Sequence, residues 1–225
     1  MVKERLVKLN VPGGVYMTGI ILAGGKNIRM GWKKAFIKIG GIPIIDIILN
    51  IFREIFSEII IVTNTPEDFE YTKVRLVKDI ITNKGSLGGL YTGIKEATFD
   101  DCFVVACDMP FINLQLINHI MQIKGYDAVV PKIDGRFQPL FATYSKNCLN
   151  VMEQHLSEEK LRISDIFTEI KAREIYENEI RLYDDKLLSL INLNTPEELH
   201  SISGLKKLGA LEKVLFLLKA SFFIL

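Results

Sequence analysis

A glycine-rich turn followed by basic residues is the first place where the sequence predicts chemistry. The segment from Leu22 to Lys34 reads LAGGKNIRMGWKK, with two glycines after an apolar run and four cations between positions 26 and 34. Backbone amides at Gly24 and Gly25 can cradle phosphate oxygens, and Arg29 and Lys34 can neutralise phosphate charge. An ordinary strand-to-helix turn with exposed basic residues is the alternative.

The spacing of this turn excludes two familiar phosphate-binding motifs. The GxxxxGK[ST] pattern of P-loops is absent, and so is the GxGxxG pattern of dinucleotide-binding folds. Lys34 is favoured over the adjacent Lys33 because Ala35 and an apolar run follow it, and Lys33 is the fallback.

Polar side chains also follow three predicted strands. Asp108 comes directly after Cys102–Ala106, a run without alternation that is typical of a strand buried on both faces. A carboxylate there is anchored yet lies at the sheet rim, as suits an oxygen ligand of Mg²⁺, although a helix N-cap or turn aspartate is the alternative. Asp79 is the second candidate carboxylate. Asn64 offers a donor and an acceptor for a base edge or a ribose hydroxyl, or is a simple turn residue.

The sequence gives little support for a histidine-based metal site or for a serine or cysteine nucleophile. The three histidines, at positions 119, 155 and 200, are far apart and form no HxxxH or HxxE pattern, so we interpret them as structural or surface residues. A GxSxG elbow is absent, and Cys107, at the end of a buried strand, is interpreted as a packing residue.

The elements that must position these residues alternate between short β-branched runs and helical patterns. This alternation predicts one three-layer α/β/α domain with a mostly parallel, Rossmann-like sheet. The predicted strands are 16–22, 59–62, 74–77, 102–106, 128–131 and 138–144. Helices are predicted from near Pro43, after the 85–89 glycine run to about Ala97, near 148–155 and near 162–170.

Ligands of open α/β sheets collect at the carboxyl ends of the strands. The residues expected to converge on one crevice there are Gly24, Asn64, Asp79 and Asp108. The second half of the chain, with a turn at Asp134-Gly135, is interpreted as the acceptor-binding side.

Composition narrows the class of protein. The 225 residues suffice for one well-buried α/β domain, expected at 1–203, with 204–225 as an apolar C-terminal helix or tail. A net charge of +1 argues against recruitment of nucleic acid by a global field. Three cysteines without a CxxC pair and an N-terminus without a signal peptide favour a reducing cytoplasm. The apolar end, 214–225, is too short to span a membrane, so packing on the body or on a sister subunit is favoured over membrane association or a disordered tail.

With these residues in view, the chain resembles the molybdenum cofactor guanylyltransferase family, which belongs to the nucleotidyltransferases with a glycosyltransferase-A-like α/β fold. The resemblance covers about residues 18–202. The family's opening pattern, LAGG followed by RMG and a lysine, is matched at 22–25, 29–31 and Lys34. The GSLGG run at 85–89 is similar to the family's GPLxG loop with serine in place of proline, and INLNTPEEL at 191–199 is similar to its closing NxNTPEEL motif.

The resemblance implies a site as well as a fold. Nucleotide contacts are implied at Leu22, Ala23, Gly24, Lys34, Asn64 and Asp79, with main chain around Gly88 near the guanine. Asp108 of the ACDMPF segment is implied to bind Mg²⁺. Asn192 and Asn194 are implied on the acceptor or metal side of the site, although a strand ending in a capped helix also explains this motif.

The implied reaction is transfer of GMP from GTP to the terminal phosphate of molybdopterin, giving the guanine dinucleotide form of the cofactor and pyrophosphate. Proteins that insert the cofactor, or molybdenum enzymes themselves, are possible partners. The alternatives are a related transferase that uses CTP or a sugar or polyol phosphate acceptor, and a noncatalytic nucleotide-binding module. The oligomeric state is left open.

Overall fold

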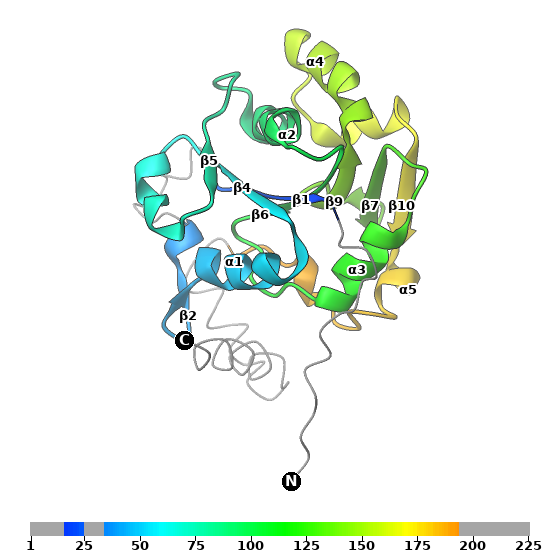
Figure 1. The fold of residues 1–225 in the computed structure, drawn as a ribbon. Helices are drawn as coiled ribbons and strands as arrows, with labels where there is room; N and C mark the ends of the chain where they lie inside the picture. The colour runs from blue at the N-terminus through cyan, green and yellow to red at the C-terminus, as the bar shows by residue number, and fades with distance from the viewer. Residues whose placement is uncertain (1–15, 25–33, 194–225) are drawn as a thin grey trace.

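A single mixed β-sheet runs through the protein (Figure 1). The computed structural model describes residues 16–24 and 34–193. The strand order is β10-β7-β9-β6-β1-β4-β5, and β8 pairs with β7 outside this path. The strands of this sheet are β1 (Thr18–Leu22), β4 (Glu58–Val62), β5 (Arg75–Val77), β6 (Asp101–Ala106), β7 (Ala128–Ile133), β8 (Arg136–Phe137), β9 (Phe141–Ser145) and β10 (Ala172–Tyr176). A small hairpin, β2 (Lys38–Ile39) and β3 (Ile42–Pro43), forms a second sheet.

Most neighbouring strands are parallel, and one strand breaks the pattern. β1 pairs in parallel with β4 and β6, β4 with β5, and β7 with β10. β9 is antiparallel to both β6 and β7, so β6 and β7 point the same way. The carboxyl ends of the parallel strands therefore share one edge of the sheet.

Helices cover both faces of the sheet and complete three layers (Figure 1). Helices α1 (Ile44–Ile55), α3 (Leu114–Gln122) and α5 (Glu177–Ile180) lie on one face. Helices α2 (Gly85–Glu96) and α4 (Leu149–Ser157) lie on the other. Each face has its own apolar core, because the side chains of a strand alternate between the two sides.

The central strands contribute apolar side chains to both cores. All five residues of β1 are buried, with Ile21 in the core beneath α1 and Ile20 in the core beneath α2. In β6, Phe103 and Val105 face the first core and Val104 faces the second. A strand that is buried on both faces needs apolar residues at successive positions, and this explains why 102–106 is an unbroken apolar run.

Two glycines let the layers approach each other closely. A Cβ on Gly19 would lie 2.5 Å from the Phe56 ring, under α1. A Cβ on Gly93 would lie 2.7 Å from Ile20 Cγ2, under α2. These contacts set the depth at which α2 lies on β1, and the first turn of α2 reaches the edge of the sheet where the strands end.

The predicted α/β fold is confirmed, and the differences concern element bounds and direction. The first strand begins at Thr18 instead of Tyr16, whose side chain is exposed. The predicted strand 138–144 begins only at Phe141, and its antiparallel direction was not predicted. The 162–170 segment forms a 3₁₀ helix, Ile163–Thr168, rather than an α-helix.

The glycine run at 85–89 is also corrected. It was expected as a loop before a helix, but α2 begins at Gly85 and contains the whole run. Gly85 itself has a φ of +59°, a value that favours glycine. The helix therefore has three glycines among its first five residues.

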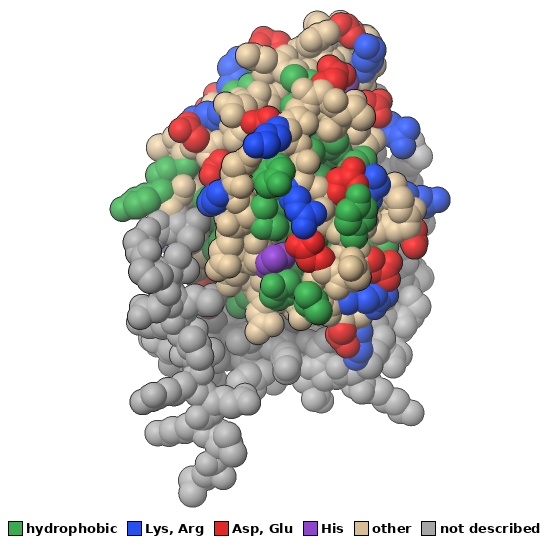
Figure 2. All heavy atoms as spheres, turned by 90° about the vertical axis from the view of Figure 1, so that its right-hand side faces the viewer, with side chains coloured by type: hydrophobic (Ala, Val, Ile, Leu, Met, Phe, Trp, Pro, Cys, Tyr) green, Lys and Arg blue, Asp and Glu red, His purple; other side chains and the backbone are tan. Residues whose placement is uncertain are grey.

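The face over β10, α3 and α5 mixes acidic and basic side chains (Figure 2). Arg173 pairs with Glu179 at 2.8 Å, and Lys132 pairs with Glu174 at 2.9 Å. Charged residues on an edge strand such as β10 also discourage pairing with a foreign strand. Among residues 16–24 and 34–193, no helix is both long and apolar enough to cross a membrane.

Several predictions fall outside the described residues. These are the cations Arg29 and Lys33, together with Gly25, His200 and Asn194. The expected domain boundary at 203 and the apolar segment 204–225 also fall there.

Candidate functional site

The candidate site is built on the edge where the parallel strands end. The register places Leu22 opposite both Val62 and Ala106. One residue further, the Ala23 amide donates to the Val62 carbonyl at 2.9 Å, and the Cys107 amide donates to the Leu22 carbonyl at 3.0 Å. The backbone that enters the glycine turn and the backbone that leads to Asp108 are therefore fixed to the same strand.

Lys34 and Asp108 meet at this edge. Lys34 Nζ donates to Asp108 Oδ2 at 3.0 Å, and the two side chains are 17% and 13% exposed. Lys34 opens a short 3₁₀ helix, Lys34–Phe36, that is anchored by buried Ala35. The ion pair therefore joins the segment after the glycine turn to the loop after β6.

The second oxygen of Asp108 is buried without a hydrogen-bond partner among the described residues. A buried carboxylate oxygen without a donor is costly, so its position calls for a cation. Asp108 does not cap a helix, because the N-cap of the next helix, α3, is Asn113. The alternative of a helix N-cap is therefore wrong, whereas Asp108 does lie in a turn after β6, as the other alternative expected.

The Asp108 carboxylate is an oxygen ligand of the kind that Mg²⁺ prefers, and one such ligand from the protein is enough for a site shared with a substrate. No three His, Cys, Asp or Glu side chains within the described ranges gather to hold a metal ion by themselves. Mg²⁺, however, is commonly bound through one or two carboxylates, waters and substrate phosphates rather than by an all-protein cage. One unpartnered carboxylate oxygen beside the Lys34 ammonium fits such a shared site.

Asn64 and Asp79 form a second polar pair on the same edge. Asn64 Nδ2 donates to Asp79 Oδ2 at 2.9 Å. Burial raises the pKa of Asp79 above its ordinary value of 3.8, and the hydrogen bond from Asn64 lowers it in part. Since Thr63 continues the pairing of β4 with β5 through its amide, 2.9 Å from the Val77 carbonyl, the two polar residues leave the sheet side by side.

The first turns of α2 lie against this pair. A Cβ on Gly89 would lie 3.5 Å from Asp79 Oδ1 and 3.8 Å from Leu22 Cδ2, so the helix main chain, Asp79 and Leu22 are neighbours. Gly88 is buried, and its amide already donates to the Lys84 carbonyl at 3.2 Å within the helix. The glycines therefore provide room rather than a free amide at Gly88.

The C-terminal motif also reaches the site. The Leu193 amide donates to the Asp108 carbonyl at 2.8 Å, and Leu193 is fully buried. Asn192, the residue before it, is exposed. The structure thus brings Asn192 beside the loop of Asp108.

The histidines and cysteines lie in local structural contacts. His119 Nε2 lies 2.8 Å from Glu179, and the buried His155 has its Nε2 2.8 Å from Glu169. Burial raises the pKa of the Cys107 thiol to about 12, which keeps it neutral at ordinary pH. A neutral, half-buried thiol suits packing and not nucleophilic attack.

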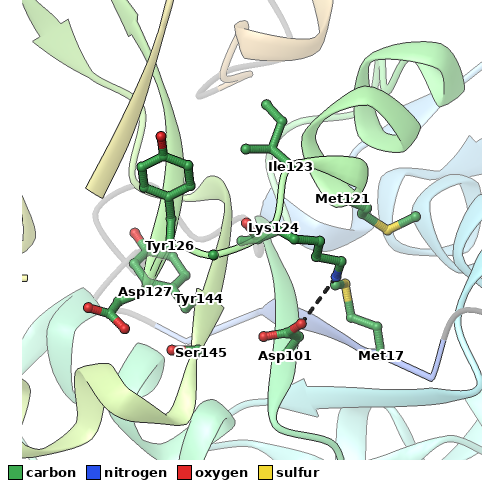
Figure 3. Close-up of a pocket in the computed structure, with 11 residues that line it drawn as sticks. Met17, Asp101, Met121, Ile123, Lys124, Tyr126, Asp127, Tyr144 and Ser145 are labelled. Carbon is green, nitrogen blue, oxygen red and sulfur yellow. Dashed lines mark hydrogen bonds and ion pairs between the residues drawn. The ribbon is translucent and has the colours of Figure 1, made fainter. Parts of the chain in front are cut away.

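A separate hollow lies at the opposite edge of the sheet (Figure 3). Asp101 begins β6 there and Ser145 ends the antiparallel β9, so the hollow is at the amino ends of the parallel strands. In Figure 3 the Lys124 side chain reaches toward Asp101, and their ion pair spans 3.1 Å. This hollow is distinct from the edge that carries Lys34 and Asp108.

The sequence did not predict the hydrogen bonds that join the start of α3 to the C-terminal segment of the site. The amide of Asn113 donates to Ser189 Oγ at 2.9 Å, which joins the start of α3 to the segment before Asn192. Asn113 before an apolar periodic run is a recognisable helix N-cap, so it could have predicted α3. The contact to Ser189 has no local signal.

The fold and the arrangement of the site define a nucleotidyltransferase. Residues 19–172 match the model of the MobA-like NTP transferase domain. The structure is similar to that of molybdopterin-guanine dinucleotide biosynthesis protein A from Archaeoglobus fulgidus, with a TM-score of 0.70 and 22% identity over 88% of this chain and 96% of that one. At that identity the likeness shows the fold alone.

The chain belongs to the molybdenum cofactor guanylyltransferase family. It is 40% identical to a probable molybdenum cofactor guanylyltransferase of Natranaerobius thermophilus over 190 residues, 81% of this chain and 93% of that protein. It is also 36% identical to the molybdenum cofactor guanylyltransferase of Desulfosudis oleivorans, over 86% of this chain and 97% of that protein.

Proposed function

We propose that this enzyme transfers GMP from GTP to the terminal phosphate of molybdopterin, forming molybdopterin guanine dinucleotide and pyrophosphate with Mg²⁺. The observation that carries the proposal is the meeting of Lys34 with Asp108 at 3.0 Å while Asp108 Oδ1 is buried without a donor. A cation-seeking carboxylate and a lysine beside a glycine turn are the parts that a metal-bound triphosphate requires.

In this proposal the ion pair changes partners when the nucleotide binds. Lys34 leaves Asp108 and meets the triphosphate, and Asp108 holds the metal. Asp108 would hold Mg²⁺ there, and the metal's positive charge would offset the charge that develops on pyrophosphate. The main chain of Leu22, Ala23 and Gly24 lies beside the phosphates, where the exposed Gly24 leaves room for close approach.

The Asn64–Asp79 pair receives the nucleoside. Guanine carries two neighbouring N–H donors on its Watson–Crick edge, and a carboxylate can accept both of them or a ribose hydroxyl. Asn64 holds the Asp79 carboxylate at 2.9 Å, and Gly89 of α2 leaves room beside it. The missing side chain of Gly88 instead makes room for Lys84 and the Ile81 carbonyl, so Gly88 is proposed near the guanine only through its main chain.

The chemistry needs alignment more than proton transfer. The acceptor phosphate is already an anionic nucleophile, and it attacks the α-phosphorus as the bond to pyrophosphate breaks. The protein must orient the two anions and neutralise their repulsion, which the cations of the 26–34 segment, Arg29 among them, would do. Asn192 and Asn194 are proposed on the acceptor side, as neutral donors to that phosphate.

The test is a product assay. The full chain is incubated with GTP, Mg²⁺ and molybdopterin, and the dinucleotide is identified by mass while pyrophosphate is measured. CTP replaces GTP in one matched reaction, and a sugar or polyol phosphate replaces molybdopterin in another. We expect product only with GTP and molybdopterin. Preference for CTP or for another acceptor would show that the enzyme is a related nucleotidyltransferase with a different substrate. If no pair of substrates gives a product, the proposal is contradicted.

We propose a cytoplasmic location as well. All three cysteines are free thiols, and burial raises the pKa of each to about 12, as suits unreactive packing residues in a reducing compartment. The role of 204–225, and of any partner that receives the cofactor, stays a prediction.

A further inference from the structure

A partly buried network of hydrogen bonds ties the start of α3 to residues 183–189. The Asn113 amide donates to Ser189 Oγ at 2.9 Å, and Asn113 Nδ2 donates to the Tyr183 carbonyl at 2.7 Å. Asn113 Oδ1 accepts from the Gln115 and Leu116 amides and caps α3. One side chain thus fixes both the helix and the C-terminal segment.

Asp184 completes this network from the other side. It is only 5% exposed, and its two oxygens accept from the Leu188 amide at 3.1 Å and the Ser189 amide at 2.8 Å. Ser189 is fully buried, donates its amide to Asp184 and accepts from Asn113. We refer to Asn113, Asp184 and Ser189 together as the 113–184–189 network.

The same segment is fixed again four residues later. Leu193, which is fully buried, donates its amide to the Asp108 carbonyl at 2.8 Å. Residues 189–193 are therefore held at both ends against the loop that connects Asp108 to α3. Asn192 lies between these two anchors and is exposed.

We infer that Ser189 and Asp184 are positioning residues for the acceptor. The 113–184–189 network holds residues 189–193 so that Asn192 stays beside Asp108, where its amide orients the acceptor phosphate. The inference rests on the proposed function and deepens it, because it assigns the acceptor side to a specific scaffold. Alignment of two reactants depends on such rigid support.

The nucleotide side does not depend on this network. Asn64, Asp79 and the glycine turn follow β4, β5 and β1, whereas the network joins α3 to the end of the described chain. Loss of the network is therefore expected to affect the acceptor more than GTP. If the network had a purely structural role, its loss would lower stability and would change the kinetics with GTP and with molybdopterin to the same extent.

The experiment compares full-length wild type with Ser189→Ala, Asp184→Ala and Asp184→Asn. Asp184→Asn keeps one accepting oxygen and serves as the conservative variant. Ser145→Ala is the control, since Ser145 Oγ also accepts a backbone amide, that of Asn147, but at the opposite edge of the sheet. The measurements are kcat, the KM for GTP, the KM for molybdopterin and the hydrogen exchange of the Leu193 amide.

Ser189→Ala and Asp184→Ala are expected to lower kcat/KM for molybdopterin about ten-fold, with the KM for GTP within about two-fold of wild type. Leu193 exchange should accelerate in both, and Asp184→Asn should recover part of the activity. If Ser189→Ala does not fold, the two Asp184 variants carry the test.

The inference would be overturned by equal losses of kcat/KM for both substrates, or by a loss of the same size in Ser145→Ala. The proposed function would still stand in that case, because the wild type makes the dinucleotide. A wild type that makes no dinucleotide would instead refute the proposed function and this inference with it.

Discussion

Lys34 and Asp108 are 74 residues apart in the chain, and their side chains lie 3.0 Å apart at the edge of the sheet. Buried Ala35 anchors the short helix that carries Lys34, and the Cys107 amide fixes the loop of Asp108 to β1 through the Leu22 carbonyl. An ion pair with so little exposure is desolvated on both sides, so its members interact more strongly than surface charges do.

Replacement of Asp108 separates its proposed metal role from its place in the fold. Asp108→Asn keeps the shape but removes the charge, and we expect turnover to fall at least about a hundred-fold through loss of electrostatic stabilisation. Asp101→Asn is the matched control at the other end of β6, where Asp101 pairs with Lys124. Turnover and the dependence of rate on Mg²⁺ concentration are measured. Full activity of Asp108→Asn would remove the carboxylate from the mechanism.

Replacement of Lys34 tests contact with the triphosphate. Lys34→Met keeps much of the length without the charge, and the KM for GTP is expected to rise about ten-fold because a charge-assisted contact is lost. Lys124→Met is the control, since the Lys124 side chain is 60% exposed in an ion pair worth about 0–1 kcal/mol. Nucleotide titration with Mg²⁺ supplies the readout, and equal effects of the two substitutions would contradict the prediction.

Gly93 tests how closely α2 must lie on β1. Gly93→Ala would put a Cβ 2.7 Å from Ile20 Cγ2, and overpacking of this kind is expected to cost about 1–3 kcal/mol in the free energy of unfolding. Denaturant unfolding is measured for Gly93→Ala, Ile20→Ala and the double variant. If the overlap is the cause, the double variant is more stable than the sum of the single effects predicts. Strict additivity would show that the two positions do not interfere.

The Asp79 carboxyl predicts how stability changes with pH. Burial raises its pKa above the ordinary 3.8, so folding favours the protonated form. Its stabilising contribution is complete below about pH 3.8 and is lost as the pH rises through the folded-state pKa. Asp79→Asn should therefore gain stability relative to wild type as the pH rises across this window, while GTP binding weakens.

Glu58 provides a control of opposite sign. Burial raises its pKa, but hydrogen bonds from Thr18, Thr98 and Arg75 outweigh this and hold the pKa below its ordinary value of 4.5. Glu58→Gln should cost stability above about pH 4.5, and the difference should vanish as the pH falls through the folded-state pKa. Unfolding by denaturant at a series of pH values measures both variants, and parallel curves for the two would contradict the assignment.

Local patterns in the sequence predicted much of the fold and the composition of the site. The unalternating run at 102–106 predicted β6, and the apolar stripe after Pro43 predicted α1. The rule that strand ends converge placed Asn64, Asp79 and Asp108 on one edge, where the structure has them. These features depend on residues near one another in the chain, so a single sequence contains them.

The remaining features depend on distant contacts. The edge strand β10 has alternating polar residues in a short segment, AREIY, and no apolar run to signal it. The antiparallel direction of β9 follows from its partners and not from its own residues. The contact of Ser189 with Asn113 spans 76 positions and leaves no local trace in the sequence.

The hydrogen bond between Leu193 and Asp108 bears on the order in which the protein is made. A ribosome delivers β6 long before residue 193, so a nascent chain can assemble most of its sheet while the Asp108 carbonyl still lacks this amide. The loop that carries the carboxylate receives this hydrogen bond only when Leu193 emerges. Synthesis itself thereby delays the moment at which a half-finished chain could hold the acceptor beside Asp108.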